Sequence, residues 1–178
     1  MSAAFIDMFP LSVLQDKILI SDENKKNMIK YVLNLEKENP NTKKISNDDA
    51  WLGDTKGNEF LFKNPEMSKL EKLISDKIKL YTEMLGINSN KLDFYYQRSW
   101  ATVTRKAERI KVHAHVQSNI SFAYYLQKPE NSGDLRFSTE PQNEIATGLF
   151  SGDHVDLGLI KKVNPRNIPN ADIKIQEN

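Results

Sequence analysis

The chain has 178 residues, 25 of them basic and 24 acidic, so its formal net charge of +1 gives no global field that would draw nucleic acid or an anionic membrane. A chain of this length fits one domain, and 39% apolar residues are enough to build a core. There is no Cys, which excludes disulfides, thiolate catalysis and zinc sites built on sulfur. We therefore expect a single folded domain over residues 1–178 with no nucleic-acid partner.

Neither a secretion signal nor a membrane span is indicated by the sequence. The first 14 residues lack a basic stretch followed by a long apolar one, and no uncharged apolar run approaches ~18 residues. These patterns predict a cytoplasmic protein without membrane contact.

Two helices are expected in the N-terminal part, about 21–86. The first begins after Ser21, a good N-cap, and stops before Pro40. The second begins at Pro65 and ends at Gly86, with apolar residues recurring at helical spacing between them. A long polar loop joins the two helices.

The remainder, about 91–178, favours short strands. Stretches rich in β-branched and aromatic residues, separated by turn-forming residues, occur at 92–104, 110–116, 120–126, 135–137, 154–163 and 173–176. Helices followed by many short strands indicate an α+β fold, an antiparallel sandwich or jelly roll with the helices packed on one face.

A His-x-His pair, His113 and His115, is the strongest chemical feature. Alternate side chains of a strand share a face, so the two imidazoles would point to the same side, with Ala114 on the other. This spacing allows both rings to reach one metal ion, but a lone pair of this kind more often lies on an ordinary solvated or hydrogen-bonded strand face. The pair alone leaves both interpretations open.

The residues around this pair resemble a family of 2-oxoglutarate- and Fe(II)-dependent oxygenases. That family has a Ser-Trp strand, a His-x-His strand, a Ser-Gly-x-Tyr-Tyr strand and a Gly-x-Leu-x-Phe strand, in this order. The corresponding segments here are Ser-Trp-Ala-Thr-Val-Thr-Arg at 99–105, His-Ala-His at 113–115, Ser-Asn-Ile-Ser-Phe-Ala-Tyr-Tyr-Leu at 118–126 and Ser-Gly-Asp-Leu-Arg-Phe at 132–137.

The resemblance implies a double-stranded β-helix, that is a jelly-roll core, with Fe(II) held by two His and one further ligand. It also implies 2-oxoglutarate as a cosubstrate, whose oxidative decarboxylation is coupled to hydroxylation of an unidentified substrate. In that family the strands on either side of the His pair line the cosubstrate pocket, which indicates Thr102, Thr104 and Tyr125 as cosubstrate-binding residues. Ordinary strand packing is the competing interpretation of these three.

The sequence departs from the broader oxygenase pattern in two ways. The second member of the pair is His115 where an acid is usual, so nickel or zinc could replace iron. The distal His and the carboxylate-binding Arg of the family are expected beyond 173–176, and the chain ends at Asn178. Either the chain is shortened and lacks the distal ligand, or His154 supplies it.

Three arginines, Arg98, Arg105 and Arg136, are possible partners of an anionic cosubstrate, because guanidinium binds carboxylate through paired hydrogen bonds. None occupies the family's carboxylate-binding position. Sheet edges left unpaired by a missing distal segment would favour a homodimer.

Two alternatives to the oxygenase remain. The first is a non-catalytic jelly-roll module, a binding or structural protein that has lost the distal metal ligand. The second is a cupin-like metal protein that uses His113, His115 and His154 without 2-oxoglutarate.

Overall fold

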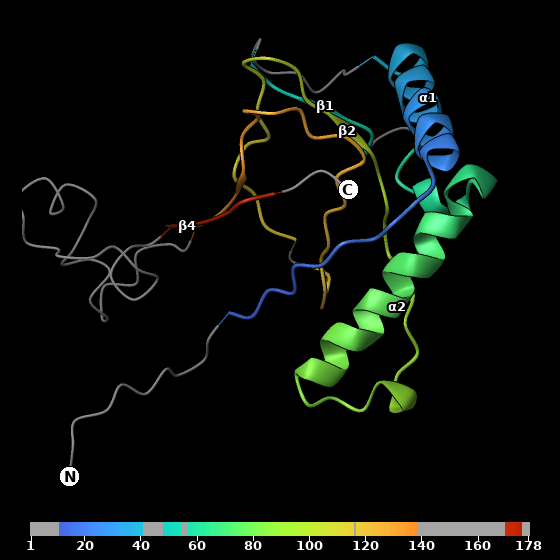
Figure 1. Cartoon of the computed structure of the whole chain (residues 1–178), viewed down its shortest axis with the longest axis vertical. Helices are drawn as coiled ribbons and strands as arrows, with labels where there is room; N and C mark the ends of the chain where they lie inside the picture. Colours follow the sequence, from blue (N-terminus) through green and yellow to red (C-terminus); the bar gives the residue numbers. More distant parts are fainter. Residues whose placement is uncertain (1–10, 41–47, 55–56, 116, 139–169, 176–178) are drawn as a thin grey trace, which may run out of the picture. The chain divides into compact units, whose positions relative to one another are not determined.

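The structure, a computed structural model, describes residues 11–40, 48–54, 57–115, 117–138 and 170–175 (Figure 1). These residues form two α-helices, short 3₁₀ turns and two antiparallel sheets of two strands each, so the α+β class is confirmed. They group into two compact units. The first comprises described residues up to Arg109 together with 117–121, and the second those within 110–116 and 122–177.

Helix α1 (Asp22–Glu38) begins where the sequence predicts. The Ser21 hydroxyl accepts a hydrogen bond from the backbone N–H of Asn24 at 3.4 Å and so satisfies one of the free donors of the first turn. Met28 and Val32, one helical turn apart, are both buried. One face of α1 therefore supplies part of the core of the first unit.

Helix α2 (Ser68–Met84) is preceded by a 3₁₀ turn, η2 (Pro65–Met67). The Asn64 side chain caps this turn by accepting from the N–H of Glu66 at 2.9 Å. Gly86, with φ +77°, ends the helical region in a conformation that favours glycine. The predicted helix is thus confirmed, with its first turn wound more tightly. Two further 3₁₀ turns are η1 (Leu61–Lys63) and η3 (Ser89–Lys91).

The first sheet pairs β1 (Trp51–Leu52) with β2 (Thr102–Val103), placing Trp51 opposite Val103. The Trp51 ring is 5% exposed, and its Nε1–H donates to the carbonyl of Asn39 at 2.8 Å. This contact links β1 to the end of α1. The buried apolar residues of the unit are Met28, Val32, Ala50, Trp51, Met67, Leu70 and Ile74.

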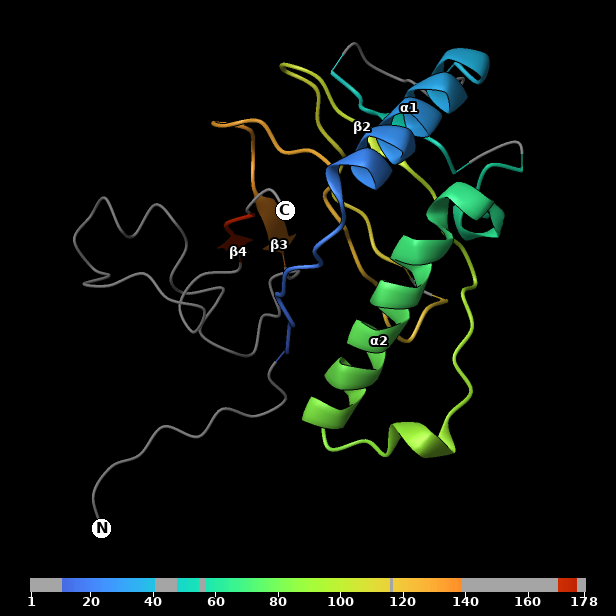
Figure 2. The same cartoon turned by 45° about the vertical axis from the view of Figure 1, so that its right-hand side comes forward.

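The second sheet belongs to the second unit and pairs β3 (Leu135–Ser138) with β4 (Asn170–Ile173), which lie side by side (Figure 2). Arg136 and Asp172 are opposite each other in the register. The guanidinium binds the carboxylate through two hydrogen bonds, Nε to Oδ1 at 2.7 Å and Nη2 to Oδ2 at 2.9 Å. This cross-strand pair supports the register of the sheet.

Several predicted strands are wrong for the residues that the structure describes. No strand forms within 110–115 or 117–126, and the predicted strand at 92–104 is reduced to β2. The prediction at 135–137 is confirmed by β3, the one at 173–176 moves to β4, and 154–163 lies outside the described residues. A local β pattern shows that residues suit a strand, but it does not show whether another strand is available to pair with them.

The described residues therefore show small sheets and no jelly roll. Val112, within the expected His strand, is 84% exposed, which agrees with a segment that has no layer of structure packed on it. A search of the same residues for a helix long and apolar enough to cross a membrane finds none.

Candidate metal centre

His113 and His115 lie together in the second unit. Their Nε2 atoms are 3.1 Å apart, the ring centroids 5.0 Å apart, and the ring planes are inclined by 40°. Both residues are exposed. The two imidazoles thus share one side of the segment, although the segment itself makes no strand ladder.

The backbone orients the first ring. Nδ1 of His113 lies 2.8 Å from the carbonyl oxygen of Lys111. A carbonyl can only accept a hydrogen bond, so Nδ1 is the donor in this contact, and the neutral ring then carries its lone pair on Nε2. A His that binds metal through one nitrogen commonly donates from the other to such a carbonyl.

The spacing of the two Nε2 atoms fits a metal ion bound to both. With metal–nitrogen bonds of ~2.1 Å, two nitrogens 3.1 Å apart subtend an angle of about 95° at the metal. That angle suits adjacent positions of an octahedral ion. Because both rings are exposed, a metal there would keep positions open for further ligands, as a catalytic site requires.

The third ligand is not found among the described residues, where no three His, Cys, Asp or Glu side chains are grouped so as to hold a metal ion. His154, the candidate from the sequence, lies outside that part of the chain. Among the described residues, His113 and His115 are therefore two possible metal donors without a third beside them.

The structure divides the three predicted cosubstrate residues between the two units. Thr102, in β2 opposite Leu52, is half-buried, and Thr104 just after it is exposed; both belong to the first unit. Tyr125 belongs to the second unit and is half-buried. Burial raises the pKa of its phenol, and the negative charge of Asp134 raises that pKa further. Tyr125 therefore stays a neutral hydroxyl donor at physiological pH.

Two of the three arginines considered as anion partners already bind carboxylates of the chain. Arg105 is held by Glu36, and Arg136 by Asp172. In each case the paired carboxylate raises the pKa of the guanidinium. The paired N–H donors of both guanidinium groups are therefore occupied by carboxylates of the chain and not available to 2-oxoglutarate in this structure.

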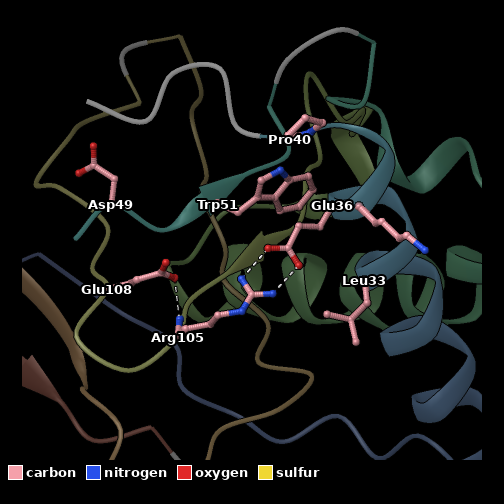
Figure 3. A pocket seen from close by; sticks show the side chains of 8 residues that line it. Leu33, Glu36, Pro40, Asp49, Trp51, Arg105 and Glu108 are labelled. Carbon is pink, nitrogen blue, oxygen red and sulfur yellow. Dashed lines mark hydrogen bonds and ion pairs between the residues drawn. The ribbon is translucent and has the colours of Figure 1, made fainter. Parts of the chain in front are cut away.

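Sequence reasoning missed a hollow in the first unit, with a volume of about 550 Å³ (Figure 3). The bidentate pair of Glu36 and Arg105 lies within it, near the indole of Trp51, and the Glu108 carboxylate accepts a hydrogen bond from the backbone N–H of Arg105 at 2.8 Å. Its lining residues are Leu33, Glu36, Lys37, Pro40, Asp49, Trp51, Arg105 and Glu108. The signal in the sequence was the presence of Trp51 in a long, otherwise polar loop, a type of loop that is often functional.

Comparison with known families finds a match, and the His pair lies within the matched segment. A family model described as "Putative 2OG-Fe(II) oxygenase" matches residues 98–158. The match covers about a third of the chain and includes His113, His115 and His154 as well as all three predicted cosubstrate residues. The description of that family names iron and 2-oxoglutarate. No curated protein and no solved structure matches the chain.

Proposed function

We propose that the chain is a non-haem, Fe(II)- and 2-oxoglutarate-dependent dioxygenase that hydroxylates an unidentified substrate, with its iron at His113 and His115. The observation that carries this proposal is the 3.1 Å separation of the two Nε2 atoms, within the segment that matches the oxygenase family. Two imidazole nitrogens at this distance suit adjacent positions on one metal ion.

His154 is the proposed third ligand, because it is the remaining His of the chain and lies within the matched segment. The proposed core is the double-stranded β-helix of the family, with β3 and β4 as two of its strands. Iron and 2-oxoglutarate bound there would couple the oxidative decarboxylation of 2-oxoglutarate to hydroxylation of the substrate.

Hydroxyl groups of the chain are proposed to hold the cosubstrate. The side chains of Thr102, Thr104 and Tyr125 can each donate a hydrogen bond to a carboxylate oxygen. Tyr125 suits this role best, because it belongs to the same compact unit as His113 and His115. Arg105 and Arg136 are left out of the proposed pocket, since each already binds a carboxylate of the chain.

The test is an anaerobic titration of Fe(II) into metal-free protein, with and without 2-oxoglutarate, following the weak visible charge-transfer band of the iron–cosubstrate chelate. The protein is compared with a double variant, His113→Ala with His115→Ala, and with Val112→Ala as matched control. Val112 precedes His113 in the sequence and its side chain is 84% exposed, so truncating it should leave the site unchanged. His154→Ala, measured separately, tests the third ligand.

We expect the charge-transfer band to form in the native protein and in Val112→Ala, and to be absent in the double variant. In a separate assay with dioxygen present, the native protein should also convert 2-oxoglutarate slowly to succinate and carbon dioxide without substrate. A folded protein that gives no band overturns the proposal and leaves a non-catalytic jelly-roll module. If the protein binds metal but 2-oxoglutarate does not strengthen the binding, the oxygenase proposal is overturned in favour of a cupin-like metal protein.

A further inference from the structure

We propose that Lys111 is a positioning residue for the His pair: its main-chain carbonyl fixes the His113 proton on Nδ1 and presets His113 Nε2 as a metal donor. The proposal rests on the proposed function only in that it assigns the same two His as ligands. The observations behind it are the 2.8 Å contact of Nδ1 with the Lys111 oxygen and the 3.1 Å contact between the two Nε2 atoms.

The first contact selects the tautomer of His113. In a free neutral imidazole the proton can occupy either nitrogen. The Lys111 carbonyl accepts a hydrogen bond only from the form with the proton on Nδ1, and one net hydrogen bond favours that form by roughly two- to tenfold. The lone pair that a metal needs is thereby already on Nε2 before the metal arrives.

The second contact then assigns the opposite tautomer to His115. Two lone pairs would repel each other at 3.1 Å, so one of the two Nε2 atoms carries the proton between them. Because His113 Nε2 carries a lone pair, the donor is the Nε2–H of His115. Metal binding therefore requires a change of tautomer at His115 and none at His113.

The positioning contact is local, which makes it independent of the rest of the proposed fold. His113 and Lys111 are two residues apart, and both lie in the described part of the second unit. The preset donor needs no neighbouring strand and no third ligand. It can therefore be measured in the metal-free full-length chain whether or not that chain turns over 2-oxoglutarate.

The first experiment is a long-range ¹H–¹⁵N correlation spectrum of the metal-free protein, at a pH high enough for the spectrum to show neutral imidazoles. The chain has three His, so single His→Ala variants assign every ring. The proposal expects His113 with its proton on Nδ1 and His115 with its proton on Nε2. A His113 that carries its proton on Nε2 overturns it.

The second experiment weakens the carbonyl itself. Replacing Val112 by its α-hydroxy acid turns the 111–112 peptide bond into an ester, whose carbonyl is a poorer acceptor, and leaves every side chain in place. The control is the same replacement at Ala114, which weakens the carbonyl of His113 instead. Both proteins are compared with the native chain for the tautomer of His113 and for Ni(II) affinity by calorimetry.

The ester at 112 is expected to lower the Nδ1–H fraction of His113 and to weaken Ni(II) binding by about tenfold, the lower end of the usual effect of losing such a partner. The ester at 114 should change affinity less than twofold. Equal effects of the two esters, or an unchanged tautomer with the ester at 112, overturn the assignment of Lys111. If only the oxygenase assay fails, the ¹H–¹⁵N spectrum can still show the expected tautomers, so the two proposals can fail separately.

Discussion

Glu36 and Arg105 are joined by two parallel hydrogen bonds, from Nη1 to Oε1 at 2.6 Å and from Nη2 to Oε2 at 2.8 Å (Figure 3). They connect the last turns of α1 to the segment that follows β2, which are 69 residues apart in sequence. The Glu36 side chain is only 16% exposed, whereas that of Arg105 is 55% exposed. The pair is therefore partly shielded from water and geometrically well matched.

Replacing Arg105 by Lys should lower the free energy of unfolding by about 1 kcal/mol, because an ammonium group cannot form the paired fork and the site is still partly open to solvent. Urea unfolding followed by circular dichroism measures the change. Arg98→Lys is the matched control, because Arg98 is also exposed and lies nearby in sequence. An equal loss of unfolding free energy in both variants would show that the paired hydrogen bonds between Arg105 and Glu36 add no stability.

Gly53 lies directly against the indole of Trp51. A Cβ atom at Gly53 would be 2.7 Å from Cη2 of Trp51 and 3.0 Å from the carbonyl oxygen of Ala101. Gly53→Ala must displace the buried ring and should cost about 1–3 kcal/mol of stability, with a shift of the Trp fluorescence. Gly133→Ala, where nothing lies within 4 Å, should change stability by less than about 0.5 kcal/mol. A Gly53→Ala variant as stable as Gly133→Ala would contradict this packing.

Both helices could be predicted because their signals are local. The Ser21 cap, the stop before Pro40 and the glycine conformation at Gly86 depend on residues within one turn of each helix end. The tighter first turn at Pro65–Met67 was not predicted, because Asn64 caps it through a side-chain contact that no periodicity reports.

The strands were harder to predict because pairing is not local. β1 and its partner β2 are about fifty residues apart, and nothing in the sequence of Trp51–Leu52 names Thr102–Val103 as the neighbour. The strand predicted at 110–116 does not form over its described residues, 110–115, because a suitable local pattern there has no neighbouring strand to pair with. The approach of His113 and His115 was nevertheless anticipated, because residues two apart in an extended segment share a side whether or not a ladder forms.

Ala107 has φ +66°, a left-handed conformation that costs a residue with a Cβ about 1–2 kcal/mol. It lies in a turn closed by the N–H of Glu108 donating to the carbonyl of Arg105 at 3.0 Å. Ala107→Gly should therefore raise the free energy of unfolding by about 0.5–1 kcal/mol after the extra chain entropy of glycine is subtracted. Thermal and urea unfolding would measure the gain. Ala123→Gly, at an exposed position with ordinary φ, should instead be neutral or destabilising, and stabilisation by both would refute the argument.

Arg136 holds the pKa of the Asp172 carboxyl below its ordinary value of 3.8, through their paired hydrogen bonds and then through its charge. A carboxyl whose pKa is lowered by folding stabilises the folded state above its unfolded pKa, and this contribution is lost as the pH falls through the folded value. The β3–β4 pairing should therefore be supported at neutral pH and weaken only in acid below 3.8.

Arg136→Gln should raise the pKa of Asp172 toward 3.8, because glutamine keeps a hydrogen-bond donor but has no charge. Arg136→Lys, which keeps the charge but not the fork, should give an intermediate pKa. The measurement is a ¹³C NMR titration of the Asp172 carboxyl, with amide exchange across β3 and β4 as the readout of pairing. If the midpoint stayed the same in Arg136→Gln, the pairing of Arg136 with Asp172 would not exist in solution, and the acid-sensitive step of this sheet would have to lie elsewhere.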